Sequence, residues 1–138
     1  MSRELETLAE QLKAGGYSLT TARKSIFLCL IGTEPQTMSE IAKAVSGSVD
    51  RASVYRTVAL FEQLGIVQRL QLGWKYKIEL SDSFTAHHHH ISCVKCGKVQ
   101  SFEESTVIAF ELKQLASEAG FTETGHQLEL RGICSSCT

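Results

Sequence analysis

The stretch that decides the fold covers residues 37–80 and reads TMSEIAKAVSGSVDRASVYRTVALFEQLGIVQRLQLGWKYKIEL. Thr37 and Glu40 have the spacing of a capping box, which predicts that a short helix begins here. After a polar turn, a longer helix is capped near Asp50 and ends at Gly65. A short helix, a turn and a longer helix are the outline of a helix-turn-helix.

Beyond Gly65 the apolar residues change from helical to alternating spacing, over residues 66–72 and again over residues 74–80. Two alternating runs around a glycine, here Gly73, predict a β-hairpin. A helix-turn-helix followed by a hairpin is a winged helix-turn-helix, in which the longer helix would enter the major groove of DNA and the wing would lie along the backbone.

Two further helices are expected before this stretch. Leucines recur at helical spacing over residues 3–14, and a second helix is predicted from a Thr20/Thr21 cap to Gly32. Together these elements predict a winged-helix DNA-binding domain over residues 1–80.

The face of the longer helix that does not carry its core residues is polar and basic, with Arg51, Ser53, Tyr55, Arg56 and Gln63. Such side chains can donate hydrogen bonds to phosphates and base edges, and a tyrosine ring can pack on a thymine methyl. Residues 1–80 carry 10 Lys and Arg against 8 Asp and Glu, whereas residues 81–138 carry 4 against 7. The first half is therefore the better candidate for contact with DNA. The alternative is an ordinary helical domain with a solvated polar face.

Length and composition limit the class of protein. The chain has 138 residues, of which 43% are hydrophobic and 21% charged, and it has a single proline. These values predict a chain that folds into one compact domain or two small ones. We expect a cytoplasmic protein without membrane association, because no apolar run approaches the roughly 18 residues of a membrane span. The N-terminal stretch MSRELETLAEQL is charged where a signal peptide would be apolar.

Four of the five cysteines form two CxxC pairs, Cys93 with Cys96 and Cys134 with Cys137. Two residues between cysteines allow both thiolates to point at one centre, and four thiolates make a closed tetrahedral zinc site. A cytoplasmic location disfavours disulfides, and a thioredoxin-type redox centre needs one such pair at a helix start. We therefore predict structural zinc. The fifth cysteine, Cys29, is expected to be a buried small apolar residue.

A run of four histidines, residues 87–90, precedes the first cysteine pair and is expected to lie on a strand. Side chains alternate along a strand, so His88 and His90 would face one side, and His87 and His89 the other. The first pair faces Glu79 at the end of the wing, whereas the second can be completed by His126 and an acid on the following helix. Neutral imidazoles suit Zn(II), Fe(II), Ni(II) or Mn(II).

The rest of the second half predicts a small α/β unit over residues 87–138, joined by a hinge over residues 81–86. A strand is expected over residues 98–102, then a helix of about four turns that ends at Gly120, then a strand from His126 to Arg131. The fold class is therefore α+β. The chain has no GxGxxG, P-loop or nucleophile-elbow motif, so we do not expect an enzyme.

Two stretches resemble the ferric uptake regulator family of metal-responsive bacterial transcription factors. They are residues 52–58, ASVYRTV, with LGIV at 64–67, and residues 87–98, HHHHISCVKCGK. The likeness extends from Gly16 to Cys137. It implies a homodimer in which residues 87–138 form the dimerisation domain, with winged helices that read a palindromic, AT-rich operator.

The resemblance also implies roles for single residues. Tyr55 and Arg56 would lie at the DNA, Lys13 and Arg23 would support backbone or minor-groove contact, and metal loading would favour the DNA-binding state. Glu79, His88 and His90 match the hinge sensor site of the family, for zinc or iron. Gln36 stands where the iron-sensing branch often has a histidine.

His87, His89 and His126 match a second metal site in the dimerisation domain of the family. Its acidic ligand on the helix falls at Ile108 or Ala109, so Glu111 or Glu104 has to substitute, and Glu111 is the predicted ligand. The expected metals are thus a structural zinc and a second divalent ion, Zn(II) or Fe(II).

The resulting hypothesis is a metal-dependent DNA-binding repressor of metal uptake or homeostasis genes, with the iron- and zinc-sensing branches both open. One alternative is a peroxide-sensing regulator of the same family. Two others come from different classes. They are a rubredoxin-like electron carrier with iron on the four cysteines, and a hydrolytic zinc enzyme that uses Glu79, His88 and His90. The hydrolase would need a substrate pocket for which the sequence offers no further residues.

Overall fold

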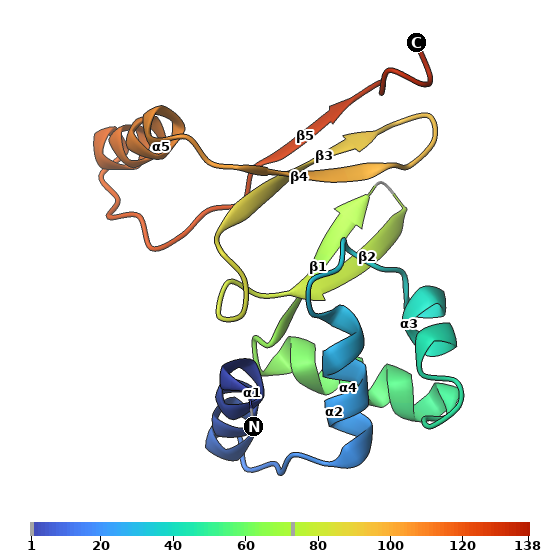
Figure 1. The fold of residues 1–138 in the computed structure, drawn as a ribbon. Coiled ribbons are helices and arrows are strands. Elements are labelled where there is room, and N and C mark those ends of the chain that lie inside the picture. Colours follow the sequence, from blue (N-terminus) through green and yellow to red (C-terminus); the bar gives the residue numbers. More distant parts are fainter. Residues whose placement is uncertain (1, 73) are drawn as a thin grey trace. The chain divides into compact units, whose positions relative to one another are not determined.

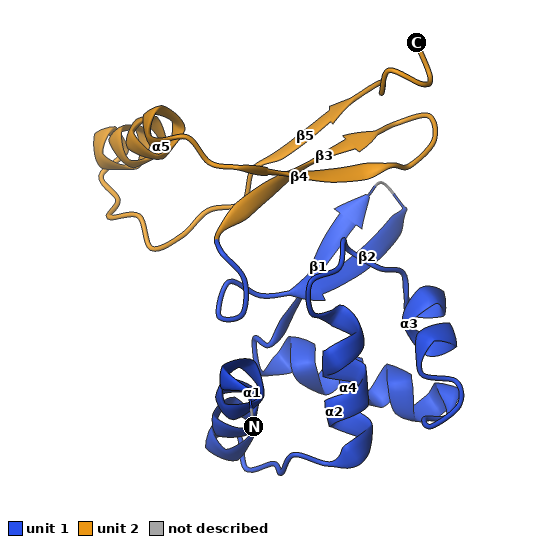
Figure 2. Cartoon of the chain, in the orientation of Figure 1, with its two compact units in different colours: residues 1–86 blue, residues 87–138 orange. Residues whose placement is uncertain are grey.

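The computed structural model describes residues 2–72 and 74–138. It divides the chain into two compact units, residues 1–86 and residues 87–138 (Figure 2). The hinge expected over residues 81–86 belongs to the first unit. None of the helices in the described ranges has the length and apolar character that crossing a membrane requires.

Unit 1 contains four helices followed by a hairpin (Figure 1). They are α1 (Arg3–Ala14), α2 (Thr21–Leu30), α3 (Met38–Ala44), α4 (Arg51–Gln63), β1 (Val67–Leu72) and β2 (Lys75–Leu80). β1 and β2 pair antiparallel, with Val67 opposite Leu80. Gly73, the expected turn glycine, lies outside the described residues. The predicted order of elements, helix-turn-helix and then wing, is therefore present.

Local capping interactions fix where these helices begin and end. The capping box at α3 is complete, because Thr37 Oγ1 accepts from the Glu40 N–H at 3.1 Å and Glu40 Oε1 accepts from the Thr37 N–H at 3.3 Å. Asp50 caps α4 by accepting from the Ser53 N–H at 3.1 Å. Gly65, with a φ of 74°, ends α4 and turns the chain into β1, a conformation that side chains other than glycine rarely adopt.

The apolar core of unit 1 lies among its helices. Its fully buried members include Leu8, Leu12, Ile26, Phe27 and Phe61. Phe84 packs edge-on against Phe27 with ring centroids 4.9 Å apart, which explains why residues 81–86 group with unit 1. Cys29, expected to be buried, is half-buried and packs against this core.

Unit 2 consists of a three-stranded sheet and one helix (Figure 1). Its elements are β3 (His88–Cys93), β4 (Val99–Glu103), α5 (Thr106–Glu118) and β5 (Glu129–Gly132). β3 is the central strand, antiparallel to β4 and parallel to β5. The last strand begins at Glu129, three residues later than the predicted start at His126.

Unit 2 buries little apolar surface. No side chain of α5, all of which is described, is buried. Val107, Phe110, Leu115 and Phe121 are 69%, 59%, 60% and 71% exposed. Exposed apolar residues this numerous on one small unit indicate a surface for a partner rather than for water.

Candidate metal centres and nucleic-acid interface

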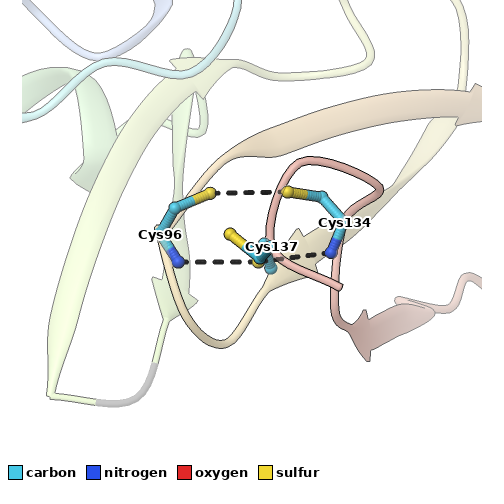
Figure 3. A group of neighbouring side chains, drawn as sticks. Cys96, Cys134 and Cys137 are labelled. Carbon is cyan, nitrogen blue, oxygen red and sulfur yellow. Dashed lines mark hydrogen bonds between the residues drawn. The ribbon is translucent and has the colours of Figure 1, made fainter.

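The four cysteines of the CxxC pairs come together at one end of the unit 2 sheet. Cys93 ends β3, and the second pair directly follows β5. Because β3 and β5 are parallel neighbours, with Cys93 paired to Gly132, both turns reach the same edge. All four sulfurs lie within 4.8 Å of one another. Figure 3 shows Cys96 and Cys134 with their sulfurs turned toward each other.

The spacing of the sulfurs fits a tetrahedral metal site. Cys96 Sγ and Cys134 Sγ are 3.7 Å apart. Two sulfurs bound at about 2.3 Å to one tetrahedral zinc are about 3.8 Å apart, whereas a disulfide bond is about 2.05 Å long. The residues present therefore fit a four-thiolate zinc, and each would supply one Sγ.

Backbone N–H donors and neighbouring thiols shift the pKa values of the cysteines in this cluster in opposite directions. The N–H groups of Cys134 and Cys96 donate to Cys93 Sγ at 3.4 and 3.5 Å and lower the pKa of Cys93 to about 6. Hydrogen bonds with the thiols of Cys134 and Cys96 raise the pKa of Cys137 to about 12. The Cys93 thiol therefore ionises more easily than an ordinary cysteine. The Cys137 thiol ionises less easily, because without a cation the charge of neighbouring thiolates is not balanced.

A second cluster brings three imidazoles onto one carboxylate within unit 2. Its members are His87, His89, Glu104 and His126. The Nε2 atom of His126 lies 3.2 Å from Nε2 of His87 and 3.3 Å from Nε2 of His89. Glu104 Oε1 lies 2.7 Å from His89 Nε2 and also contacts His126 Nε2.

The two distances between ring nitrogens are those of ligands around one ion, whereas Glu104 Oε1 lies at hydrogen-bond distance from His89. Nitrogen and oxygen donors bound tetrahedrally at about 2.0–2.1 Å are about 3.3–3.4 Å apart. Hydrogen bonds from His89, and then His126, hold the pKa of Glu104 below its usual value, so its carboxylate form is favoured. Three ring nitrogens of the same type and an ionised carboxylate therefore converge on a single point.

The acid of this cluster is Glu104, and the prediction of Glu111 needs correction. Glu111 is exposed on α5 and is not among the four grouped side chains. The reason is strand alternation: His89 pairs with Phe102 of β4, and Glu104, two residues further, keeps the same face as His89. If β3 and β4 are treated as a hairpin, alternation along the two strands indicates that His89 and Glu104 can share a face.

The other two histidines of the run form a separate pair. The rings of His88 and His90 are 4.8 Å apart, centroid to centroid. His90 is opposite Glu129 of β5, and its Nδ1 lies 3.8 Å from Glu129 Oε1. The sequence does not predict that Glu129 lies beside His90, because no local pattern indicates that β5 pairs parallel with β3.

The third ligand predicted for the hinge site, Glu79, lies in unit 1, as does Gln36, which stands where the iron-sensing branch often has a histidine. Glu79 is buried on β2 and accepts a hydrogen bond of 2.6 Å from Gln68 Nε2 on β1. The side-chain nitrogen of Gln36 donates to Cys29 O at 2.8 Å and to Thr33 Oγ1 at 2.9 Å. Because Glu79 belongs to unit 1 and the two histidines to unit 2, the shared hinge site remains a prediction.

The face of α4 predicted to meet DNA lies on the surface. Arg51, Tyr55, Arg56 and Gln63 are exposed, and Ser53 is half-exposed. The Arg51 guanidinium lies over the Tyr55 ring at 5.7 Å, and Arg56 donates to Ser53 Oγ at 3.1 Å. The opposite face is buried through Val54, Thr57, Val58 and Phe61. The exposed face of α4 thus carries two local pairs of side chains, Arg51 with Tyr55 and Arg56 with Ser53, and its contact with DNA remains a prediction.

Two further basic residues were predicted near DNA. Lys13 is exposed in the last turn of α1. Arg23 is half-buried, donates from Nη1 to Ser18 O at 2.7 Å and stacks over Tyr17 at 5.5 Å. Both remain predictions as DNA contacts.

A winged helix with exposed basic side chains on α4, joined in one chain to thiolate and imidazole clusters, has the features of a metal-responsive DNA-binding transcription regulator. The comparisons with known proteins agree. The model of the ferric uptake regulator family matches residues 14–131. The chain therefore belongs to the ferric uptake regulator family, and its α+β fold with a four-cysteine knuckle is confirmed.

Individual relatives cover nearly the whole chain. The ferric uptake regulation protein of Campylobacter upsaliensis is 37% identical over 142 residues, which cover 96% of this chain and 88% of the relative. The peroxide-responsive repressor PerR of Staphylococcus saprophyticus is 32% identical and covers 99% of this chain and 98% of its own. The crystal structure of the Vibrio cholerae ferric uptake regulator has a TM-score of 0.76 at 30% identity, with 91% and 98% covered. These relatives favour a transcription regulator over the electron carrier and the hydrolase.

Proposed function

We propose that this chain is a homodimeric repressor of metal uptake or homeostasis genes, which binds operator DNA when divalent metal is loaded. The observation that carries the proposal is the convergence of Nε2 of His87, His89 and His126 on Glu104, since such a set of donors has no evident use except to hold an ion. In this proposal the four cysteines hold a permanent zinc. The imidazole cluster holds a second divalent ion.

The chemistry of the donor sets favours zinc in both clusters of unit 2. The cysteine sulfurs are soft ligands that suit zinc in a closed site. Three imidazoles, with ring nitrogens 3.2 and 3.3 Å apart, and one carboxylate also suit Zn(II), whereas Fe(II) commonly takes more ligands than these four residues supply. At the hinge, Glu79, His88 and His90 are the proposed sensor ligands for Zn(II) or Fe(II), which leaves the peroxide-sensing branch open.

The homodimer rests on the exposed apolar side chains of unit 2. Phe110 is 59% exposed on α5, and Leu130 and Ile133 beside the second cysteine pair are 45% and 48% exposed. A second copy of the same surface would bury these groups in an isologous interface, where every contact occurs twice. The proposed interface therefore supplies the core that unit 2 lacks alone.

Phe110→Glu is expected to weaken the dimer. Burying one phenylalanine contributes at least about 1.5 kcal/mol, and the two-fold axis doubles this to about 3 kcal/mol, or roughly a 150-fold higher dissociation constant. Sedimentation equilibrium of the zinc-loaded protein would measure it. Glu118→Gln, an exposed change near the end of the same helix, is the control and should leave the dimer intact. A monomeric parent, or a Phe110→Glu dimer of parental strength, would contradict the proposed interface.

Tyr55→Ala and Arg56→Ala are expected to weaken specific operator binding by about 1–3 kcal/mol each, with metal content unchanged. Arg56→Ala should also lower the salt dependence of binding if its guanidinium holds a phosphate, and Tyr55→Ala should mainly relax base preference. Fluorescence anisotropy with labelled operator DNA at several salt concentrations measures both effects. Tyr55→Phe keeps the ring and should retain most of the preference. Parental affinity in both alanine variants would show that α4 is not the reading helix.

A further inference from the structure

One ring nitrogen of the imidazole cluster, Nδ1 of His126, makes no hydrogen bond to the other three residues of the cluster. Nε2 of His126 faces Glu104 and the other two imidazoles. Its Nδ1, on the opposite side of the ring, is buried and has no hydrogen-bond partner within the described part of the chain. A carboxylate oxygen, Oε2 of Glu123, lies 3.6 Å from this atom. A buried polar atom without a partner calls for an explanation.

The loop between α5 and β5 places the two residues together. Glu123 and His126 are three residues apart in this loop, and their side chains are only 15% and 18% exposed. The separation of 3.6 Å exceeds a good hydrogen bond by about 0.6 Å, a movement that a loop side chain can make when its partner donates a proton. The carboxylate therefore lies within reach of Nδ1.

We propose that Glu123 is a positioning residue of the imidazole site: it accepts the Nδ1–H of His126 and thereby fixes the tautomer that presents Nε2 to the metal. This inference rests on the proposed second metal site. Glu123 is not a ligand itself, because it contacts the edge of the ring that faces away from Glu104. A histidine that binds metal almost always donates its other N–H to a carboxylate, a carbonyl or water.

The negative charge of Glu123 is also expected to strengthen metal binding at the imidazole site. Three neutral imidazoles, the Glu104 carboxylate and a divalent cation leave a net charge of +1 at a site that is partly shielded from water: His89 is buried, Glu104 and His126 are half-buried and His87 is exposed. The Glu123 carboxylate brings the sum to zero. An unbalanced charge is costly away from water, so removing Glu123 should weaken the metal more than its distance from the ion would suggest.

The test uses full-length dimer with its cysteine zinc, in a His88→Ala, His90→Ala background so that a single imidazole cluster remains. Glu123→Gln keeps the shape and removes the charge, and Glu118→Gln removes an exposed carboxylate from α5 as a matched control. Zn(II) titration against a competing chelator should show affinity weaker by roughly 10- to 100-fold in Glu123→Gln and unchanged in Glu118→Gln. Zinc on the cysteines should stay at parental stoichiometry in both variants.

A second readout separates positioning from a general structural role. In the zinc-loaded parent, nitrogen NMR of labelled histidine should show His126 protonated on Nδ1, with slow exchange of that proton. In Glu123→Gln the exchange should be faster, while the melting temperature measured before zinc is added to the imidazole site stays unchanged. Glu123→Asp, which keeps the charge, should recover part of the affinity.

The outcomes are distinguishable. If the parent takes up no zinc beyond that on the cysteines, the proposed imidazole site and the role of Glu123 both fail. If the parent binds zinc but Glu123→Gln binds it equally tightly with the same Nδ1–H exchange, the site stands and the inference about Glu123 is overturned. If Glu123→Gln melts at a lower temperature before zinc is added, Glu123 has a structural role and the inference is also overturned.

Discussion

Cys96→Ser is expected to release about one zinc ion per chain and to unfold unit 2. A structural zinc contributes on the order of 10 kcal/mol or more to folding, which exceeds the whole stability of many small domains. Unit 2 has little to replace it, because within residues 87–138, all of which are described, no apolar side chain other than that of the proposed zinc ligand Cys93 is buried. Loss of the metal should therefore remove the fold of the unit and, with it, the proposed dimer.

The matched control for this variant is Cys29→Ser in α2. The Cys29 thiol donates to Ile26 O at 3.0 Å within its own helix, and a serine hydroxyl can make the same bond. We expect this variant to keep its zinc and its circular dichroism spectrum. Zinc analysis and near-ultraviolet circular dichroism of both variants make the comparison. A Cys96→Ser protein that is folded, dimeric and fully loaded with zinc would rule out the four-thiolate centre. An intensely coloured iron protein would support the rubredoxin-like alternative.

The elements of unit 1 could be predicted because their signals are local. Thr37 and Glu40 are close in sequence, and their side chains bond to backbone atoms of the same turn. Gly65 ends α4 and changes the spacing of apolar residues immediately afterward. Such interactions need no knowledge of the rest of the fold.

The errors arise where distant segments pair. His90 and Glu129 are neighbours only because β5 lies parallel to β3, and parallel pairing leaves no signal in either strand. The alternating sequence predicts a last strand from His126, whereas the strand that pairs with β3 begins at Glu129. Glu111 was preferred because the family resemblance placed the acid on the helix, whereas strand alternation favours Glu104. Strand pairing and side-chain clusters thus overrode local pattern.

His88→Ala with His90→Ala is expected to abolish the metal-dependent part of operator binding, while zinc on the cysteines and the dimer are retained. The argument follows from the order of the chain. Glu79 ends the wing of the DNA-binding unit, and the two histidines begin the next unit, after residues 81–86. A metal bound by all three would restrict the relative orientation of the units and so favour one DNA-binding state.

The size of the effect follows from the coupling between metal and DNA. Allosteric coupling is typically about 1–3 kcal/mol, which corresponds to roughly a 5- to 150-fold difference in operator affinity with and without metal. Glu79 on β2 accepts a hydrogen bond from Gln68 at 2.6 Å. Because Glu79 is the proposed sensor ligand from unit 1, Glu79→Gln should also reduce the difference in operator affinity with and without metal. A similar loss of the metal response in Glu79→Gln and in the His88→Ala, His90→Ala variant would support one sensor site that uses ligands from both units.

The decisive comparison is with the opposite face of the same strand. His89 belongs to the cluster with Glu104 and His126, so His87→Ala with His89→Ala removes two ligands of the imidazole site and leaves His88 and His90 in place. We expect this double variant to lower dimer stability more than it changes the response to metal. Anisotropy titrations of operator DNA with both double variants, with and without added Zn(II) or Fe(II), measure the two responses side by side. A parental response in the His88/His90 variant, combined with its loss in the His87/His89 variant, would move the sensor from the hinge to the imidazole cluster.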